Sequence, residues 1–506
     1  MKHAHVVITA LLAWSAPAFG RAKDRPRIAV IGSGIGGSSA AFFLRQELGV
    51  QAVIDVYEAE PQAGGRLLEF TYLNSTYEAG GSIIYSGNRY MSDLATSMGL
   101  TKVEPPKTLW RYGMSLFWLK RTVAKALDKF LTIYALQNEG FTFATPAELW
   151  SKIGLNDYVN MTIADHLWSA VGEHTLLERE LVYAVNRVNY NQDNDLNALA
   201  GLISLVTLVG GDLFKIKEGN AKVAQKLLGV AGARLHFEVT VTGVASTDTQ
   251  QYKLLAGNES LGEYDAVLIA APLELAGIAF NIDGATDPPA PQHPFQTTHA
   301  TFVRGRLRSE YFSVEEGKGM PQTVLLTEDG QGEVFSSIAL YERLEDGDGV
   351  YKLFSRKPLH TGLLDGLFGA GAWRTLFHRR WSAYPKLQPQ HSAAAPPVIL
   401  YAGHGIFYVN ALEATVSAME VLVIAARNAA LLARQWLAAD ADGADASAAA
   451  PSLATEASSS SGGSSGSGSG GGGAVPSLDV QRAPPGGGSD TGADVVMGAA
   501  DVLVEL

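Results

Sequence analysis

The alternation of apolar and polar positions first becomes regular after Pro26. The stretch RIAVIG is a continuous apolar run, which is typical of a buried parallel strand. It is followed by a glycine-rich turn at residues 32–37 and by SSAAFFLRQELG, which predicts a helix. A second apolar run, AVIDVYE, then ends at Glu58. The pattern therefore predicts a strand, a turn, a helix and a second parallel strand in succession.

Similar alternation of apolar strands and turns occurs in three separate segments. These segments are 26–95, 205–275 and 396–437, and longer aromatic and mixed stretches lie between them. We expect the three segments to form one α/β domain, and the stretches 96–204 and 276–395 to form a second, inserted α+β domain. Beyond Trp436 the composition changes to Ser/Gly-rich sequence, so residues 438–506 are predicted to be a low-complexity, disordered tail.

The first twenty residues, MKHAHVVITALLAWSAPAFG, have the pattern of a secretory signal peptide. They have a basic start, an apolar run and a stretch of small residues, although an ordinary N-terminal strand or helix is the alternative. Glycosylation sequons begin at Asn74, Asn160 and Asn258. The apolar segment VSAMEVLVIAARNAALLA is interrupted by Glu420 and Arg427, so it predicts a buried helix and not a membrane span. We therefore expect a protein of the secretory pathway, located in the lumen of a lysosome or vacuole.

Charge and composition exclude several classes of function. The formal net charge is −12 and the pI is about 5.4, which argues against nucleic acid as a partner. The sequence has no cysteine, so disulfides, thiolate metal sites, thiol nucleophiles and cysteinyl cofactor linkages are excluded. The eleven histidines show no metal-ligand spacing, and no metal site is expected.

The glycine-rich turn fits the pattern G-x-G-x-x-G of dinucleotide-binding proteins. It comprises Gly32, Ser33, Gly34, Ile35, Gly36 and Gly37. The first glycine permits the tight turn, the second lets a diphosphate approach the backbone, and the third lets the helix pack on the strand. Glu58 follows the last glycine by about 20 residues, where a carboxylate accepts hydrogen bonds from ribose hydroxyls. A glycine-rich turn without a ligand is the alternative.

Further motifs resemble those of the glutathione-reductase and amine-oxidase superfamily of flavoproteins. Two stretches resemble the segments that contact the flavin: AEPQAGGRLLEF resembles the one at the diphosphate, and YEAGGSIIY the one at the ring. A strand whose valine contacts adenine is resembled by HFEVTVTGVAS. The last helix of these proteins, which points at the flavin, is resembled by NALEATVSAMEVLVIAARNAALLA. The last segment could equally be a core helix. The resemblance implies non-covalent FAD in a Rossmann-type domain, with contacts at Ala59, Gly64, Gly65, Arg66, Gly80, Gly81, Ser82, Val241 and Glu413.

No second dinucleotide loop is expected. The stretch GLFGAGAW at 366–373 contains glycines, but no buried strand precedes it and no acidic partner follows it. A second site for a nicotinamide cofactor is therefore not expected, and the lack of cysteine excludes the disulfide reductases. Electrons from an organic substrate would then pass most simply to O₂, so an oxidase is expected.

At a narrower level the chain resembles the prenylcysteine oxidases, also called prenylcysteine or farnesylcysteine lyases. The most specific stretches are VNRVNYNQDNDLNALAG, KEGNAKVAQKLL and SAMEVLVIAARNAALLA. The resemblance implies an FAD-dependent thioether oxidase that acts on farnesylcysteine or geranylgeranylcysteine from degraded prenylated proteins. Hydride would leave the carbon beside sulfur, and water addition would give cysteine and a prenyl aldehyde, while O₂ would give hydrogen peroxide.

The sequence identifies the catalytic residues only as candidates. Arg187 and Tyr190 lie in the narrow motif NRVNYNQ, where a structural role is equally open, and His404 precedes the predicted flavin helix and could act as a base. The segment 108–136 is predicted to be an amphipathic helix that packs on the core, lines an isoprenoid channel or touches a membrane surface. Its apolar face would carry Val123, Ala126, Leu127, Phe130, Leu131 and Tyr134, and Arg121, Lys125 and Lys129 would lie away from it. A flavin amine oxidase and a non-catalytic flavoprotein or lipid-binding relative are the alternative functions.

Overall fold

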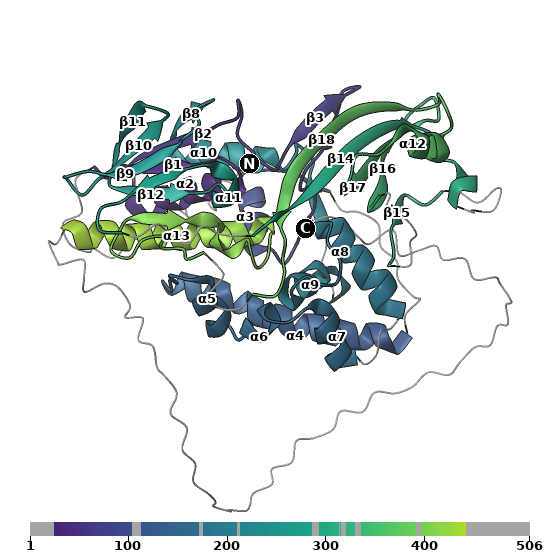
Figure 1. Ribbon diagram of the computed structural model, residues 1–506, viewed down its shortest axis with the longest axis horizontal. Coiled ribbons are helices and arrows are strands. Elements are labelled where there is room, and N and C mark those ends of the chain that lie inside the picture. Colours follow the sequence, from purple (N-terminus) through teal and green to yellow (C-terminus); the bar gives the residue numbers. More distant parts are fainter. Residues whose placement is uncertain are drawn as a thin grey trace, which may run out of the picture.

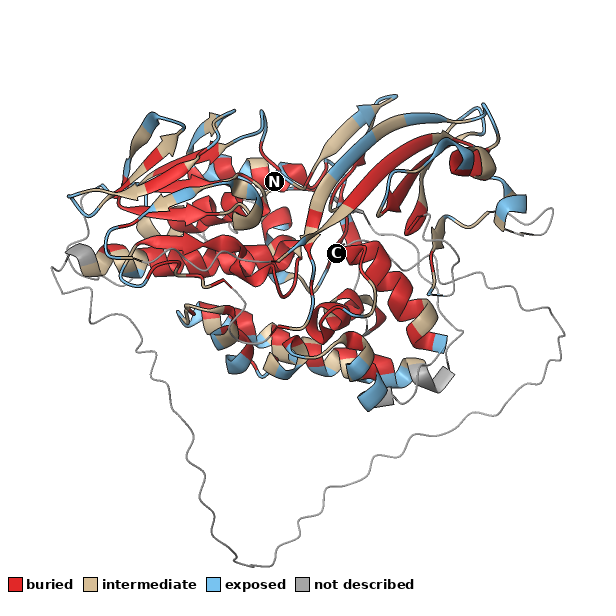
Figure 2. Ribbon diagram, viewed as in Figure 1, coloured by how far each residue is buried: buried red, intermediate tan, exposed pale blue. Residues whose placement is uncertain are grey.

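The computed structural model describes residues 25–103, 113–171, 176–209, 213–285, 293–312, 314, 320–328, 335–390 and 396–441. The predicted signal peptide at 1–20 lies outside these residues, as does the predicted tail from 442 onward. Within the described part, the molecule has two lobes above a cluster of helices (Figure 1). Figure 2 shows that the buried residues extend through all three regions.

The first lobe is built on a five-stranded parallel sheet with the order β19-β12-β1-β2-β8. The strands are β1 (Arg27–Ile31), β2 (Val53–Glu58), β8 (Arg234–Phe237), β12 (Ala266–Ile269) and β19 (Ile406–Tyr408). The chain leaves β1 toward β2 on one side, whereas β12 pairs with β1 on the other, so the strand order reverses at β1. In open α/β sheets, ligands bind beyond the carboxyl ends of the strands at such a reversal.

Helices follow the parallel strands as the sequence predicts. Helix α2 (Ile35–Leu48) joins β1 to β2, α10 (Ala221–Ala231) precedes β8, and α13 (Met419–Ala441) packs along α2. The middle of α2 is buried because small and aromatic side chains, from Ser38 to Leu44, pack between these elements. The expected α/β fold with a Rossmann-type sheet is therefore confirmed.

Smaller sheets change the expected domain boundaries in two places. β13 (Ala279–Asn281) pairs with β9 (Gly243–Ser246) in the four-stranded sheet β11-β10-β9-β13, although it lies in the expected second domain. β6 (Lys102–Val103) pairs with β7 (Leu213–Ile216), which also pairs with β5 (Ile84–Tyr85). Long-range backbone pairing of this kind leaves no local signal in composition. β10 (Tyr252–Ala256) and β11 (Glu259–Tyr264) complete the four-stranded sheet.

The second lobe is a strongly curved antiparallel sheet with the order β15-β16-β17-β14-β18. Its strands are β14 (Phe295–Gly305), β15 (Thr323–Leu325), β16 (Ser337–Arg343), β17 (Gly349–Ser355) and β18 (Arg374–Pro385). One face packs against helix α12 (Thr361–Phe368). The other face packs against the hairpin of β3 (Glu69–Tyr72) and β4 (Ser75–Glu78), so part of the N-terminal segment supports the second lobe.

Helices form the third region, below the two lobes in Figure 1. They are α4 (Gly113–Asn138), α5 (Pro146–Lys152), α6 (Asn156–Val159), α7 (Ile163–Val171), α8 (Tyr183–Tyr190) and α9 (Ala198–Ser204). The amphipathic pattern of α4 is confirmed, because Val123, Ala126, Phe130 and Tyr134 are buried, whereas Arg121 and Lys125 are exposed. Leu127 and Leu131 are half-buried against the same core.

The last helix, α13, continues to Ala441, slightly past the expected boundary at 437. Among the described helices it alone has the length and apolar composition needed to cross a membrane. However, 72% of its apolar window is buried inside the protein. This burial agrees with the prediction of a core helix.

A buried carboxylate ties three helices together. Glu420, near the start of α13, accepts hydrogen bonds from the backbone N–H groups of Tyr90 and Met91, which open helix α3 (Arg89–Ser97). Its Oε1 also accepts a hydrogen bond from Tyr134 of α4 at 2.6 Å. Burial raises the pKa of Glu420 to about 7, although the three hydrogen bonds act in the opposite direction.

This pKa predicts that the contribution of Glu420 to stability is larger in acid. A carboxyl group with a higher pKa in the folded than in the unfolded state binds its proton more tightly when folded. Its contribution is therefore complete below pH 4.5, the ordinary pKa, and is lost as the pH rises through about 7. We expect the free energy of unfolding to fall by up to about 3 kcal/mol over this window.

Glu420→Gln should flatten this pH dependence, measured by urea unfolding at a series of pH values. Glu139→Gln, at an exposed position just after α4, is the control and should retain the slope of the parent protein. Equal slopes for the parent and the Glu420→Gln variant would show that Glu420 is not the responsible group.

Candidate active site

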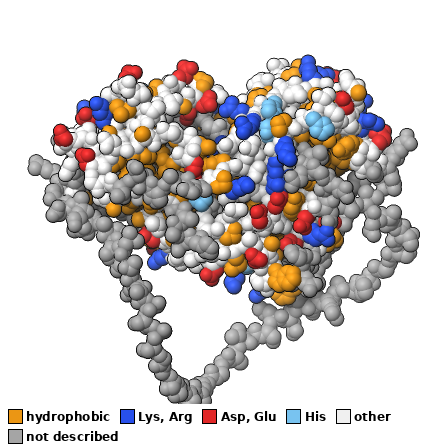
Figure 3. All heavy atoms as spheres, viewed as in Figure 1, with side chains coloured by type: hydrophobic (Ala, Val, Ile, Leu, Met, Phe, Trp, Pro, Cys, Tyr) orange, Lys and Arg blue, Asp and Glu red, His pale blue; other side chains and the backbone are white. Residues whose placement is uncertain are grey.

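A cavity with a volume of about 400 Å³ lies beyond the carboxyl ends of β1, β2 and β12. Its lining comes from the glycine-rich turn, the loop after β2, the loop after β12, strands β17 and β18, and the start of α13. The cavity therefore lies between the parallel sheet of the first lobe and the antiparallel sheet of the second. Figure 3 shows a notch between these two lobes at the molecular surface.

Two glycine-rich loops meet backbone to backbone at one end of the cavity. The amide of Gly64 donates to the carbonyl of Ser33 at 3.2 Å, and Gly34 forms a bridge with Gly64. A Cβ on Gly34 would lie 3.7 Å from the Gly64 oxygen and 3.9 Å from the Cα of Gly65. Side chains at these positions would therefore occupy the space between the two loops, where bare backbone lines the cavity.

Ser33 and Glu58 are held together at the same end. Glu58 accepts hydrogen bonds from the backbone N–H of Ser33 at 2.8 Å and from its hydroxyl at 2.7 Å. The carboxylate is thus fixed at the end of β2, and both residues line the cavity together with Gly32, Ile35 and Gly36. Because Gly34 is the N-cap residue of α2, the positive end of the helix dipole also faces the cavity.

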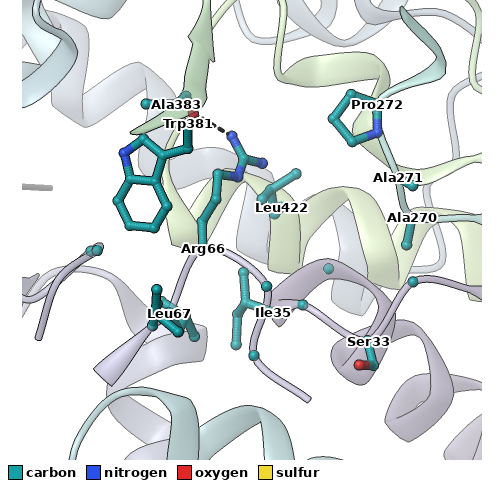
Figure 4. Close-up of a pocket in the computed structure, with 18 of the residues that line it drawn as sticks. Ser33, Ile35, Arg66, Leu67, Ala270, Ala271, Pro272, Trp381, Ala383 and Leu422 are labelled. Atoms are coloured by element: carbon teal, nitrogen blue, oxygen red, sulfur yellow. Dashed lines mark hydrogen bonds between the residues drawn. The ribbon is translucent and has the colours of Figure 1, made fainter. Parts of the chain in front are cut away.

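An ion pair joins Arg66, in the loop after β2, to Glu413, just before α13. Arg66 also donates to the carbonyl of Ala383 on β18 at 2.7 Å, so it links both lobes (Figure 4). Glu413 is buried and accepts further hydrogen bonds from Asn410 and Ser417. Burial acts to lower the pKa of Arg66, but the charge of Glu413 and its hydrogen bond, together with Tyr384 and Tyr408, outweigh burial, and the pKa is raised. The guanidinium therefore remains charged beside the cavity.

Five of the predicted cofactor residues do not line the cavity. A Cβ on Gly37 would lie 1.9 Å from the carbonyl oxygen of Gly32, so this glycine permits close packing of helix and turn. Ala59 is exposed. Val241 is buried in the segment that connects β8 to β9. The hydroxyl of Ser82 lies 3.4 Å from the hydroxyl of Tyr341. Glu413 acts on the cavity through Arg66. Gly64, Gly65, Gly80 and Gly81 do line it.

The rest of the lining was not predicted from the sequence. Ala270, Ala271 and Pro272, in the loop after β12, lie on the same side as the glycine-rich turn. The second lobe and the start of α13 supply the others, which include Thr298, Phe354, Trp381, Tyr384 and Met419. In Figure 4 the Trp381 ring lies beside Arg66, across the cavity from Ser33 and Ala270. The loop after β12 could have been found, because carboxyl ends of neighbouring parallel strands meet at one edge of a sheet. The sheet residues could not, because only tertiary packing brings them to the cavity.

Comparisons with known proteins agree with this arrangement. Residues 100–446 match the family model described as prenylcysteine lyase, and residues 30–97 match that of an NAD(P)-binding Rossmann-like domain. The chain is 31% identical to prenylcysteine oxidase 1 of Mus musculus, over 80% of this chain and 88% of the relative. It is 30% identical to farnesylcysteine lyase of Arabidopsis thaliana, over 80% and 87%.

The chain belongs to the prenylcysteine lyase family. Its fold is also that of solved amine oxidases. A putrescine oxidase variant superposes with a TM-score of 0.55 at 15% identity, over 81% of this chain and 99% of that one. Cyclohexylamine oxidase from Brevibacterium oxydans superposes with a TM-score of 0.53 at 17% identity, over the same shares. At this identity the likeness concerns the fold alone.

The motif NRVNYNQ, quoted for its resemblance to the prenylcysteine lyase family, forms a buried polar junction in the structure. Arg187 is buried and pairs with Asp193 at 3.0 Å, and Arg356 also pairs with Asp193. Asn191, in the left-handed conformation that ends α8, donates to the Thr298 hydroxyl at 3.0 Å. Because Thr298 lines the cavity and Arg187 does not, Arg187 is placed as a support for the second lobe and not at the cavity.

The other two catalytic candidates also lie outside the cavity lining. Tyr190 is fully buried, and its ring packs edge-on against Tyr384, which does line the cavity, with 5.7 Å between ring centres. Burial raises the pKa of Tyr190, so its hydroxyl stays protonated. His404 lies between Tyr252 and Tyr401, beside the four-stranded sheet. Burial lowers the pKa of His404, and the structure does not bring it to the cavity.

Proposed function

We propose that this protein is an FAD-dependent oxidase that cleaves prenyl-L-cysteine to cysteine, a prenyl aldehyde and hydrogen peroxide, with O₂ as the electron acceptor. The names of its relatives specify a prenylated cysteine as substrate. The observation that carries the proposal is the cavity itself. On one lobe it is lined by the two glycine-rich loops, which are suited to bind a diphosphate, and on the other by an apolar, aromatic wall.

The residues present fit a flavin dinucleotide. Bare backbone at Gly34 and Gly65 leaves room for a diphosphate, and Arg66 supplies the positive charge beside it. Glu58 is placed for ribose hydroxyls. The Oδ1 atom of Asn410 is buried in the lining without a hydrogen-bond partner in the described structure, as expected where a polar ligand completes the site. When bound, FAD would supply the hydride acceptor.

Non-covalent binding is supported by the chemistry of the lining. The chain has no cysteine, and the described residues that line the cavity include no histidine. The substrate side is supplied by Leu67, Phe354 and Trp381, which offer apolar surface for an isoprenoid chain and exclude water from the reacting carbon.

The test is to supply purified protein with farnesylcysteine in air. We expect a yellow protein that releases hydrogen peroxide, cysteine and a prenyl aldehyde in equal amounts. Peroxide from polyamines but not from the thioether would instead assign a flavin amine oxidase. A colourless, inert protein would assign a binding module and refute the proposal.

We also propose a luminal, acidic location such as a lysosome or vacuole, with a cleaved signal peptide and glycosylation. The three sequon asparagines, Asn74, Asn160 and Asn258, are all exposed, as glycosylation requires.

Peripheral membrane contact is a further part of the proposal, since prenylated cysteines partition into lipid. Phe117 and Trp118 on α4 are 55% and 48% exposed, and their rings pack edge to face. Lys120, Arg121 and Lys125 are exposed on the same helix. Lys129 was expected to lie away from the core, but it is half-buried and its ammonium group donates to the Gly154 carbonyl at 2.6 Å. In Figure 3 hydrophobic side chains are visible at the lower edge of the helical cluster.

Phe117→Ser combined with Trp118→Ser should reduce binding to anionic vesicles about thirtyfold or more, because each aromatic ring that enters the bilayer contributes about 1 kcal/mol or more. Vesicle co-sedimentation measures the change. Leu73→Ser, which removes an equally exposed apolar side chain from the tip of the β3–β4 hairpin, is the control. Unchanged sedimentation of the double variant would remove membrane contact from the proposal.

A further inference from the structure

One buried cation lies on the wall of the second lobe that faces the cavity. Lys352 is in the middle of β17 and is only 3% exposed. Side chains alternate between the two faces of a strand, so Lys352 shares a face with Val350 and Phe354. Phe354 lines the cavity, and Val350 packs against the β3–β4 hairpin. The ammonium group therefore lies just behind the cavity wall.

Aromatic rings and a carbonyl surround this ammonium group. Its Nζ lies 4.4 Å from the ring centre of Phe354 and 5.7 Å from that of Tyr341. It also donates a hydrogen bond at 3.3 Å to the carbonyl of Gly80, a residue that lines the cavity. Aromatic faces and a carbonyl oxygen are the groups with which proteins bind alkylammonium ions. The arrangement is thus a cation site that the chain fills with its own lysine.

We propose that Lys352 is a specificity-determining residue that disfavours cationic groups at this wall and favours an uncharged reacting group such as a thioether. The proposal rests on the function proposed above and deepens it. The ammonium group of Lys352 repels a ligand with a positively charged head. The aromatic rings that would attract such a head are already in contact with Lys352. An uncharged sulfur atom meets no such repulsion.

Binding of two matched probes tests this proposal without turnover when the flavin is first reduced and O₂ is excluded, because no oxidant is then present. Geranyl methyl sulfide carries an uncharged head, and geranyltrimethylammonium carries a permanent positive charge on the same chain. We expect the parent protein to bind the sulfide and to reject the cation, as measured by isothermal titration calorimetry. Lys352→Met keeps the length of the side chain and removes its charge, and should raise the affinity for the ammonium probe about tenfold relative to the sulfide.

Two further variants make the result decisive. Lys215→Met is the matched control, because Lys215 lies 5.9 Å from the ring centre of the same Tyr341 but is exposed and does not line the cavity. Lys352→Arg retains the charge and should retain the selectivity of the parent, even if packing at this buried position is altered. Lys352→Ala removes the ammonium group from between the aromatic rings and the Gly80 carbonyl. This variant should therefore bind methylammonium, whereas the parent protein should not.

The possible failures are distinguishable. Equal probe selectivity in the parent and in Lys352→Met would overturn the role of Lys352 while leaving the proposed oxidase intact. If Lys352→Arg loses selectivity as fully as Lys352→Met, shape and not charge is responsible, and the proposal is again overturned. A parent protein that binds no geranyl sulfide would instead count against the proposed substrate class.

Discussion

Gly34→Val should yield a folded protein that has lost its flavin. A Cβ at this position meets the Gly64 oxygen at 3.7 Å and the Gly65 Cα at 3.9 Å, which are ordinary contact distances. The backbone of Gly34 is extended, with φ −65°, so a branched side chain is accommodated without strain. The added methyl groups occupy the space in which the diphosphate would approach the backbone. We therefore expect the flavin content of the purified protein to fall to about one tenth or less, equivalent to at least about 1.4 kcal/mol of binding.

The matched control for this variant is Gly229→Val on helix α10. Gly229 is exposed, and a Cβ there would have no neighbour within 4 Å. The control should retain the flavin, measured by visible absorbance after gel filtration and by the adenine dinucleotide released on denaturation. If Gly34→Val remains as yellow as the control, the two glycine loops do not hold the diphosphate.

Arg66→Met should have the second large effect, on both cofactor content and stability. It removes the cation beside the diphosphate site and leaves Glu413 buried without its ionic partner. Removing one partner of a buried ion pair typically costs about 3 kcal/mol or more. The hydrogen bond to the Ala383 carbonyl, which joins the two lobes, is lost as well. We expect a clear decrease in the free energy of unfolding of the apoprotein, together with loss of flavin.

A second substitution separates these two effects. Arg66→Met combined with Glu413→Gln removes both charges, and the glutamine oxygen still accepts a hydrogen bond from Ser417. Rotation of the Asn410 amide, whose Nδ2 now faces Glu413, turns its unpaired Oδ1 toward the new glutamine NH₂ group. The double variant should recover most of the stability of the apoprotein but none of the flavin. Recovery of flavin in the double variant would mean that Arg66 acts only by neutralising Glu413.

The first lobe was largely predictable because its signals are local. The apolar run of β1, the glycine-rich turn and Glu58 lie within one strand–helix–strand unit, and each needs a particular residue for a reason that short-range geometry supplies. The Gly64–Arg66 motif was predicted from its resemblance to the diphosphate-contact segment of flavoproteins. Its ion pair with Glu413 was not, because these residues are far apart in the sequence and meet only when α13 packs on α2.

The second lobe shows where sequence reasoning ends. Phe354 lies in β17, which is buried along its whole length, and Trp381 lies in β18, which is mostly exposed or half-buried. Neither pattern indicates that these two residues line a cavity. Lys352 is more instructive, since a lysine within a strand ordinarily predicts an exposed position. Its burial depends on Phe354, Tyr341 and the Gly80 carbonyl, which come from three separate segments. The motif NRVNYNQ was singled out as a source of catalytic candidates, whereas the structure shows that its polar groups support the second lobe.

The most direct test of the central claim is anaerobic reduction of the bound flavin by farnesylcysteine. Purified protein is mixed with the substrate without O₂ in a stopped-flow instrument, and the visible absorbance of oxidised flavin is followed. We expect complete bleaching in a single turnover, slower when the carbon beside sulfur carries deuterium, and recovery of the yellow colour with peroxide release when O₂ is admitted. Flavin that stays oxidised with farnesylcysteine but bleaches with an amine would contradict the account.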